Sequence, residues 1–230
     1  MDPAGILLRT PLFRDLRVDD VEELLPDVRE RRFARGEVLW LEGDPATELY
    51  VIADGQVKIS RVSVDGREVI IGLQAPVSVT GEVGLFHPRG IRWLNVTAMR
   101  ATTCLTLRRG PLLSFLSRHP AAMQRMLERL SILAVDVAYS LSGVAFDGIP
   151  RRVAAMVLQL ARTYGADTAD GLRIDIRLSQ SELAAHVAAS RENVNRALSG
   201  LVSSGVISQR AGYFYVHDLA ALESAAVEPG

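Results

Sequence analysis

The sequence predicts an α+β protein made of three successive parts: a β-rich N-terminal roll, one long central helix, and a C-terminal domain of paired short helices with a small hairpin. Three observations support this prediction. Short β-rich runs separated by glycine fill about the first hundred residues, an apolar heptad pattern follows Pro120, and a polar, arginine-bearing helix pair precedes two short β runs. The expected boundaries are residues 1–119, 120–147 and 148–230.

Length and composition fit a globular protein of modest size. The chain has 230 residues, of which 48% are hydrophobic and 23% charged, and its net charge is −1. It contains no apolar run of the roughly 20 residues that a bilayer crossing requires, its N-terminus lacks a signal-peptide core, and its lone cysteine, Cys104, cannot form an internal disulfide. We therefore expect a cytoplasmic protein without a membrane-spanning segment. Acidic residues gather between Asp15 and Glu23 whereas arginines recur in the C-terminal domain, so we expect local charge to matter more than the sum.

The N-terminal part reads as a roll or barrel of short strands. Asp65-Gly66 is a strong hairpin signal between two of the β-rich runs, because this dipeptide adopts the backbone of a tight turn. Short strands at this spacing are typical of a closed or rolled sheet. The expected strands cover 48–52, 56–62, 67–73, 95–99 and 102–107.

The central helix is expected to begin near Pro120 and to dimerise. Apolar residues follow heptad spacing with Ser140 as the one polar seam position, and this pattern favours a coiled coil between two copies of the chain. The alternative is a seam within one chain, with Met123 and Met126 filling gaps in the core. The seam residues are Met123, Met126, Leu130, Leu133, Val137 and Val144.

A hinge at 146–150 should separate this helix from the C-terminal domain, since Gly148 loosens the chain and Pro150 restarts a helix. That helix is expected to end near Gly165. A half-buried strand should follow, in which apolar residues alternate with polar ones. The apolar residues are Val153, Val157, Leu160 and Ala161 in the helix, and Leu172, Ile174, Ile176 and Leu178 in the strand.

The stretch 178–198 predicts two short helices with a tight turn. Ser179 and Glu182 form a capping-box pattern at the start of the first helix. Leu183 and Val187 share one face of it, and the second helix has its own apolar stripe. At 3.6 residues per turn, the opposite face of the second helix is polar. The stripe consists of Val194, Ala197, Leu198 and Leu201, and the polar face of Glu192, Asn195, Arg196 and Ser199 with Arg191 beside it.

These side chains suit the edges of DNA bases. Arginine donates two parallel bonds to guanine, glutamate accepts from cytosine and asparagine pairs with adenine, while Ser179 and Gln180 can hold phosphates. An isolated helix of this kind would be read as a solvated surface, but the second helix and the wing-like hairpin at 205–216 favour DNA reading. The predicted DNA-binding residues are Ser179, Gln180, Ser190, Arg191, Glu192, Asn193, Asn195 and Arg196.

The glycine-rich run 43–57, the segment Gly81-Glu82-Val83-Gly84-Leu85-Phe86, the long helix and the motif at 190–196 together resemble the CRP/FNR family of bacterial transcription regulators over residues 12–216. The resemblance implies a cyclic-nucleotide-binding roll, a dimerising helix, a winged helix-turn-helix that reads palindromic double-stranded DNA, and RNA polymerase as a partner. Arg191, Glu192 and Arg196 match the family's base-reading positions, which implies half-sites of the TGTGA type. Asn193 and Asn195 stand where the best-known member has smaller residues, which leaves preference at neighbouring bases open.

The resemblance also implies an effector site built from Gly81, Glu82, Val83, Arg92 and Trp93. Glu82 matches the residue that binds the ribose hydroxyl and Arg92 the residue that binds the cyclic phosphate of cAMP or another cyclic nucleotide. Trp93 departs from the pattern, because the family has a Ser or Thr there and an indole supplies no hydroxyl. Val137 and Ala138 likewise replace hydroxyl residues on the central helix.

Two alternatives to an effector site follow from these departures. Glu82 and Arg92 can pair with each other inside an altered pocket, since buried charges are usually partnered. Trp93 can fill or reshape the pocket, so that the protein binds DNA without an effector and its abundance is the control.

Other classes of protein fit the sequence less well. An iron–sulfur sensor needs several cysteines, and the candidate haem ligand His87 stands before Pro88 in an expected loop. We find no metal-ligand cluster and no nucleophile–base arrangement, and with the C-terminal part assigned to DNA reading we expect no enzyme. A nonspecific architectural DNA-binding protein is the remaining alternative of a different kind.

Overall fold

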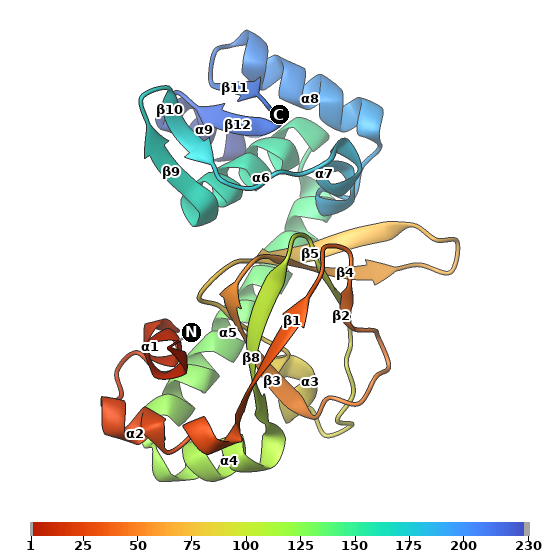
Figure 1. Ribbon diagram of the computed structural model, residues 1–230. Helices are drawn as coiled ribbons and strands as arrows, with labels where there is room; N and C mark the ends of the chain where they lie inside the picture. The colour runs from red at the N-terminus through yellow and green to blue at the C-terminus, as the bar shows by residue number, and fades with distance from the viewer. Residues whose placement is uncertain (1, 228–230) are drawn as a thin grey trace. The chain divides into compact units, whose positions relative to one another are not determined.

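The computed structural model describes residues 2–227, apart from the side chains of 139–142, 144 and 145 (Figure 1). Ser140 and Val144 of the expected seam therefore lie outside the described side chains. By their internal contacts the residues form two compact units, Met1–Asp136 and Val137–Gly230, whose boundary falls within helix α5 (Pro120–Phe146). The division at residues 119 and 147 stays a prediction.

The N-terminal unit contains two four-stranded antiparallel sheets, in the strand orders β1-β8-β3-β6 and β2-β7-β4-β5. All five expected strands are confirmed, and Gly66 takes a positive φ of 80° in the turn between β4 and β5. The sheets comprise β1 (Val28–Phe33), β2 (Val38–Trp40), β3 (Glu48–Asp54), β4 (Val57–Val62), β5 (Glu68–Gln74), β6 (Val79–Thr80), β7 (Asn95–Ala98) and β8 (Thr102–Arg108).

Strand β1 was not expected from the sequence. Its central residues are charged and exposed, so the apolar alternation that signals a strand is missing. The strand forms because it pairs with β8 along its whole length, from Val28 opposite Leu107 to Phe33 opposite Thr102. Backbone hydrogen bonds to β8, and not alternating apolar side chains, therefore hold this strand in the sheet.

Helices enclose the first sheet on one side. They are α1 (Pro3–Arg9), α2 (Val18–Glu22), α3 (Glu82–Phe86), α4 (Arg109–Arg118) and the first half of α5, with a short 3₁₀ turn at Leu25–Asp27. One apolar core joins strands β3, β6 and β8 to these helices, and the rings of Phe13 and Phe115 meet edge to face at 6.0 Å within it. A second core, which includes Trp40, Tyr50 and Cys104, lies among the strands.

The prediction that the start of α5 packs against a second copy of the chain is wrong. Met126 is 1% exposed in the core of its own chain, and Met123 and Leu130 pack against the same core. The seam at these positions is intramolecular because α1, α2 and the roll supply apolar partners. The large apolar side chains that α5 leaves exposed in this unit are instead Leu127, Ile132 and Val135, at 59%, 61% and 52%.

The C-terminal unit packs helices on a small antiparallel sheet of order β11-β12-β10-β9. The expected helix is confirmed as α6, and the expected hairpin as β11 and β12 with Ala211-Gly212 at positive φ between them. The unit comprises α6 (Ile149–Tyr164), β9 (Gly165–Thr168), β10 (Gly171–Ile174), α7 (Gln180–His186), α8 (Arg191–Ser203), β11 (Ile207–Arg210), β12 (Tyr213–Val216) and α9 (Leu219–Val227).

The strand expected over 172–178 is shorter than predicted. Pairing with β12 covers Leu172 to Ile174 only, and the chain then leaves the sheet towards α7. Ile176 and Leu178 are buried outside the strand, so their apolar character reflects burial rather than a β ladder.

Candidate nucleic-acid interface and effector pocket

The start of α7 is fixed by the capping box that the sequence predicts. The Ser179 hydroxyl accepts a hydrogen bond from the Glu182 amide at 3.2 Å, and the Glu182 carboxylate accepts from the Ser179 amide at 2.8 Å. Both groups satisfy amides that the first turn of a helix would otherwise leave without partners. The predicted phosphate contact Gln180 is the first residue of α7 and is exposed.

Helix α8 begins at a second cap. Ser190 accepts a hydrogen bond from the Asn193 amide at 3.3 Å, and the turn before it contains Ala188 at φ 50°. Buried Leu183 of α7 and Val194 of α8 lie on the apolar sides of the two helices. The packing and the cap together orient the remaining face of α8 outward, as the sequence predicts.

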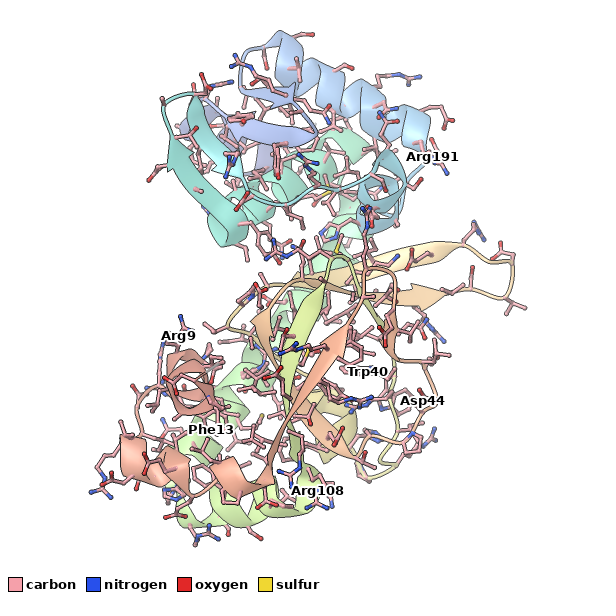
Figure 2. The ribbon with its side chains drawn as sticks, in the orientation of Figure 1. Arg9, Phe13, Trp40, Asp44, Arg108 and Arg191 are labelled. Atoms are coloured by element: carbon pink, nitrogen blue, oxygen red, sulfur yellow. The ribbon has the colours of Figure 1, made fainter. Side chains whose placement is uncertain are left out.

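The outward face carries two arginines with free guanidinium groups. Arg191 and Arg196 are exposed, and within the described part of the chain neither forms a hydrogen bond or ion pair; Figure 2 shows Arg191 at the beginning of α8. Other arginines of the same unit are engaged. The ion pairs are Arg151–Asp147, Arg162–Glu223, Arg173–Asp175 and Arg210–Asp170, with N–O distances of 2.6, 2.7, 3.2 and 3.4 Å.

Glu192 lies beside Arg191 in the first turn of α8. Its own backbone amide and the Ser190 hydroxyl donate to the carboxylate and hold the pKa of Glu192 below its ordinary value, with a smaller contribution from Arg191. The side chain therefore stays an ionised acceptor at neutral pH, the form that can accept from a cytosine amine.

The structure also joins two predicted residues that the sequence did not connect. Asn195 of α8 donates a hydrogen bond to Gln180 of α7 at 3.0 Å. Spacing on a single helix cannot reveal this contact, because the two residues are 15 positions apart on different helices.

An arginine that sequence reasoning missed, Arg177 in the segment between β10 and α7, packs against the hairpin beyond α8. The Arg177 guanidinium lies over the Tyr213 ring of β12, 4.5 Å from its centroid. Residues 148–230 contain eight arginines and eight acidic residues, so the formal charges of the domain cancel. Positive charge is available locally, at side chains such as Arg191 and Arg196 that form no ion pair with a described residue.

In the N-terminal unit, Arg92 points into the protein and is 3% exposed. Its guanidinium donates to the carbonyl oxygens of Gly81 at 3.0 Å and Glu48 at 2.7 Å, and it lies 4.2 Å from the centroid of the Trp40 ring. Burial lowers the pKa of Arg92. Gly81 is required at this point, because a Cβ there would lie 2.5 Å from the Arg92 guanidinium and the backbone φ is 90°.

Glu82 is paired with a residue that the sequence analysis did not single out. Its carboxylate accepts from Arg129 of α5 at 2.7 Å, and Arg129 also donates to the Val79 carbonyl. The Glu82 side chain is 4% exposed and that of Arg129 is 25% exposed. The alternative in which Glu82 and Arg92 pair with each other is therefore wrong, because Glu82 pairs with Arg129 and Arg92 bonds to two carbonyl oxygens.

The recorded ring contacts of Trp93 are with His87 and Arg89 and not with Arg92. Trp93 is 37% exposed and contacts the His87 ring edge to face, with centroids 4.9 Å apart. The Arg89 guanidinium lies over the Trp93 ring. The indole against Arg92 belongs to Trp40, which Figure 2 labels among the strands of the N-terminal unit. Trp40 precedes the glycine-rich run 43–57 and therefore lies outside the motifs that resemble the family.

The described residues were also compared with the requirements of a metal site, a membrane-spanning helix and a reactive cysteine. Between residues 2 and 227, no group of three or more histidine, cysteine or acidic side chains is arranged to hold a metal ion. Over the same span, no helix is long and apolar enough to cross a membrane. Cys104 is buried, and burial raises the pKa of its thiol to about 12, which fits a core residue.

Comparison with known proteins matches both halves of the chain. The cyclic nucleotide-binding domain family matches residues 30–119, and the Crp-like helix-turn-helix domain family matches residues 151–225. The CRP-like cAMP-activated global transcriptional regulator of Mycobacterium tuberculosis is 32% identical over 88% of this chain and 90% of its own length. The cyclic AMP receptor protein of Thermus thermophilus is 29% identical over 94% of this chain and 97% of its own.

A crystal structure of a CRP-family transcriptional regulator from Thermus thermophilus superposes with a TM-score of 0.70 at 27% identity, over 86% of this chain and 97% of that one. A β-roll that precedes a winged helix-turn-helix defines a class of DNA-binding transcription regulators that are not enzymes. Within that class, the chain belongs to the CRP/FNR family.

Proposed function

We propose that the protein is a homodimeric transcription regulator that reads a palindromic site with half-sites of the TGTGA type. Arg191 and Arg196 are assigned to guanines and Glu192 to a cytosine amine. Ser179, Ser190 and Asn193 lie at the two helix starts, where contacts to the DNA backbone fix the register of a reading helix. At 13 residues, α8 is long enough to lie in the major groove.

The observation that carries this proposal is the exposure of Arg191 and Arg196 on α8, where neither forms an ion pair with any described residue, whereas four other arginines of the same unit do. Two exposed guanidinium groups without acidic partners keep their paired donors available for guanine O6 and N7. Selection of binding sites from random duplex DNA with the full chain tests the reading. We expect a two-fold symmetric site with half-sites one helical turn apart, and enrichment of no sequence would overturn the proposal.

The proposed dimer uses the exposed apolar side chains of α5. Leu127, Ile132 and Val135 lie within an arc of about 140° at 100° per residue, which is the width of a buried helix face. The double variant Ile132→Asp/Val135→Asp should sediment as a monomer. Dimerisation would bring the new carboxylates of the two protomers together and remove them from water, and both effects oppose association. Val18→Asp, at an exposed valine of α2, should leave the dimer intact. If the double variant still sediments as a dimer, the interface does not lie on this face of α5.

We also propose that an anionic nucleotide, cAMP or another cyclic nucleotide, controls the protein through the pocket at Glu82 and Arg92. The two side chains supply the charges that such a ligand needs, but both are bonded internally. Ligand binding therefore exchanges the Arg92–carbonyl and Glu82–Arg129 bonds for bonds to phosphate and ribose, and shifts the protein towards the form that the ligand prefers. The Mycobacterium tuberculosis relative, which is described as cAMP-activated, supports this assignment.

Calorimetry with cAMP and with cGMP, together with DNA titrations in the presence and absence of each nucleotide, tests the effector. We expect heat of binding for one nucleotide and a change of about 5- to 150-fold in DNA affinity, the usual range of allosteric coupling. DNA affinity that saturating nucleotide leaves unchanged would favour an effector-independent regulator. The same family assignment leads us to propose a cytoplasmic location and RNA polymerase as a partner.

A further inference from the structure

A hydrogen bond joins the two helices of the reading motif at their exposed edge. The Asn195 side chain amide donates to the Gln180 side chain oxygen, 3.0 Å away. Both residues line a groove of about 480 Å³ beside α8. The polar wall of this groove is uncharged and consists of Gln180, Asn195, Ser199, Ser203 and Gln209.

The bond leaves Asn195 with a defined set of free groups. One amide hydrogen is used on Gln180, and the second hydrogen and the carbonyl oxygen remain available. A donor beside an acceptor is the pattern that pairs with N7 and N6 of adenine in the major groove. An asparagine amide otherwise turns freely about a soft torsion, and the bond to Gln180 holds it in one orientation before DNA arrives.

Gln180 can hold this orientation because its own backbone is fixed. It directly follows Ser179, which the capping box ties to Glu182. Asn195 lies three residues after Glu192 and four before Ser199, so its amide shares the outward face of α8 with both. The amide is thus held at a set place relative to Glu192.

We propose that Asn195 selects adenine at one position of each half-site, and that Gln180 is a positioning residue that acts through Asn195. The inference rests on the proposed function, DNA reading by α8, and deepens it by assigning one more base pair. Gln180 thereby has a role in sequence preference beyond a phosphate contact.

Site selection and equilibrium titrations with the full chain test the proposal. Asn195→Ala should lower the preference for adenine over other bases at one half-site position by about tenfold or more. Gln180→Ala should lower the same preference by roughly two- to tenfold, the effect of one hydrogen bond. Gln180→Glu keeps the acceptor oxygen, so it should retain the preference even though its charge weakens binding to every sequence.

Gln209→Ala is the matched control, since Gln209 lines the same groove from β11. It should change neither the preference nor its position. An unchanged adenine preference in Asn195→Ala would overturn the assignment, and so would a Gln180→Ala variant that weakens all sequences equally. These outcomes differ from failure of the proposed function, in which the unaltered protein would select no site.

Discussion

The arginines of the proposed reading face are exposed and unbonded among the described residues, whereas those of the proposed effector site are bonded within the protein. Arg191 and Arg196 stand exposed on α8 without partners in the described chain, whereas Arg92 is buried against two carbonyl oxygens and an indole, and Arg129 holds the buried Glu82. Under the proposed function, the first arrangement would bind DNA without rearrangement, whereas the second would have to break internal bonds before it bound a nucleotide. The proposal thus predicts that the DNA site is preorganised and that the effector site is not.

The largest effect should come from removing the cation of the pocket. Arg129→Met leaves the Glu82 carboxylate buried without a partner, and we expect a loss of about 3 kcal/mol in the free energy of unfolding. Urea unfolding followed by tryptophan fluorescence measures it, because Trp40 and Trp93 both lie in the N-terminal unit.

Arg125→Met is the control for that variant. Arg125 lies on the same helix and pairs with Asp15 and Glu128 at the surface, where screening by solvent leaves an ion pair with little effect on the free energy of unfolding. If Arg129→Met costs no more than Arg125→Met, the Glu82–Arg129 pair does not organise the pocket. Partial recovery in Arg129→Met/Glu82→Gln would show that the stranded charge causes the loss.

The next effect concerns the reading face. Arg191→Ala and Arg196→Ala should each cost roughly 1–3 kcal/mol on the selected site and relax base preference at one position. Arg162→Ala, which removes an arginine already paired with Glu223, should leave DNA affinity nearly unchanged. Titrations on the selected duplex and on a scrambled duplex measure the loss of affinity. Equal losses on both duplexes would show that the two arginines contact phosphates and not bases.

The smallest effect is a pH dependence confined to the reading domain. Burial lowers the pKa of His186, in α7, below its usual 6.5, so the unfolded chain binds this proton more readily than the folded chain. Stability of α7 should therefore fall as the pH drops below about 6.5, by at most about 1.4 kcal/mol per pH unit. Hydrogen exchange of the α7 amides reports it.

His186→Leu should abolish this loss of protection at low pH, and His217→Gln, at an exposed position, should preserve it. A pH dependence that survives in His186→Leu would assign the effect to another group.

The sequence predicted features that arise from local spacing. The capping box of α7, the Asp65-Gly66 turn, the hairpin at Ala211-Gly212 and the outward face of α8 all depend on residues a few positions apart. The contacts that distinguish this chain join distant segments: Gln180 to Asn195, Glu82 to Arg129, and Arg92 to Trp40. No periodicity encodes them.

The errors have the same origin. Heptad spacing on α5 predicts an interface between chains, but spacing alone does not reveal whether a partner belongs to the same chain, and Met126 packs in the core of its own chain. The position of Trp93 directly after Arg92 predicts an indole in the effector site, although the indole that contacts Arg92 is that of Trp40 from β2.

The central claim is that a preorganised face on α8 reads base sequence, and the ratio of two dissociation constants tests it most directly. The full-length protein is titrated, at several salt concentrations, against a palindromic duplex with TGTGA-type half-sites and against the same duplex scrambled. We predict binding to the palindrome that is about a thousandfold tighter or more at physiological salt. A ratio near one at every salt concentration, with steep loss of binding as salt rises, would contradict the claim and identify a nonspecific DNA binder.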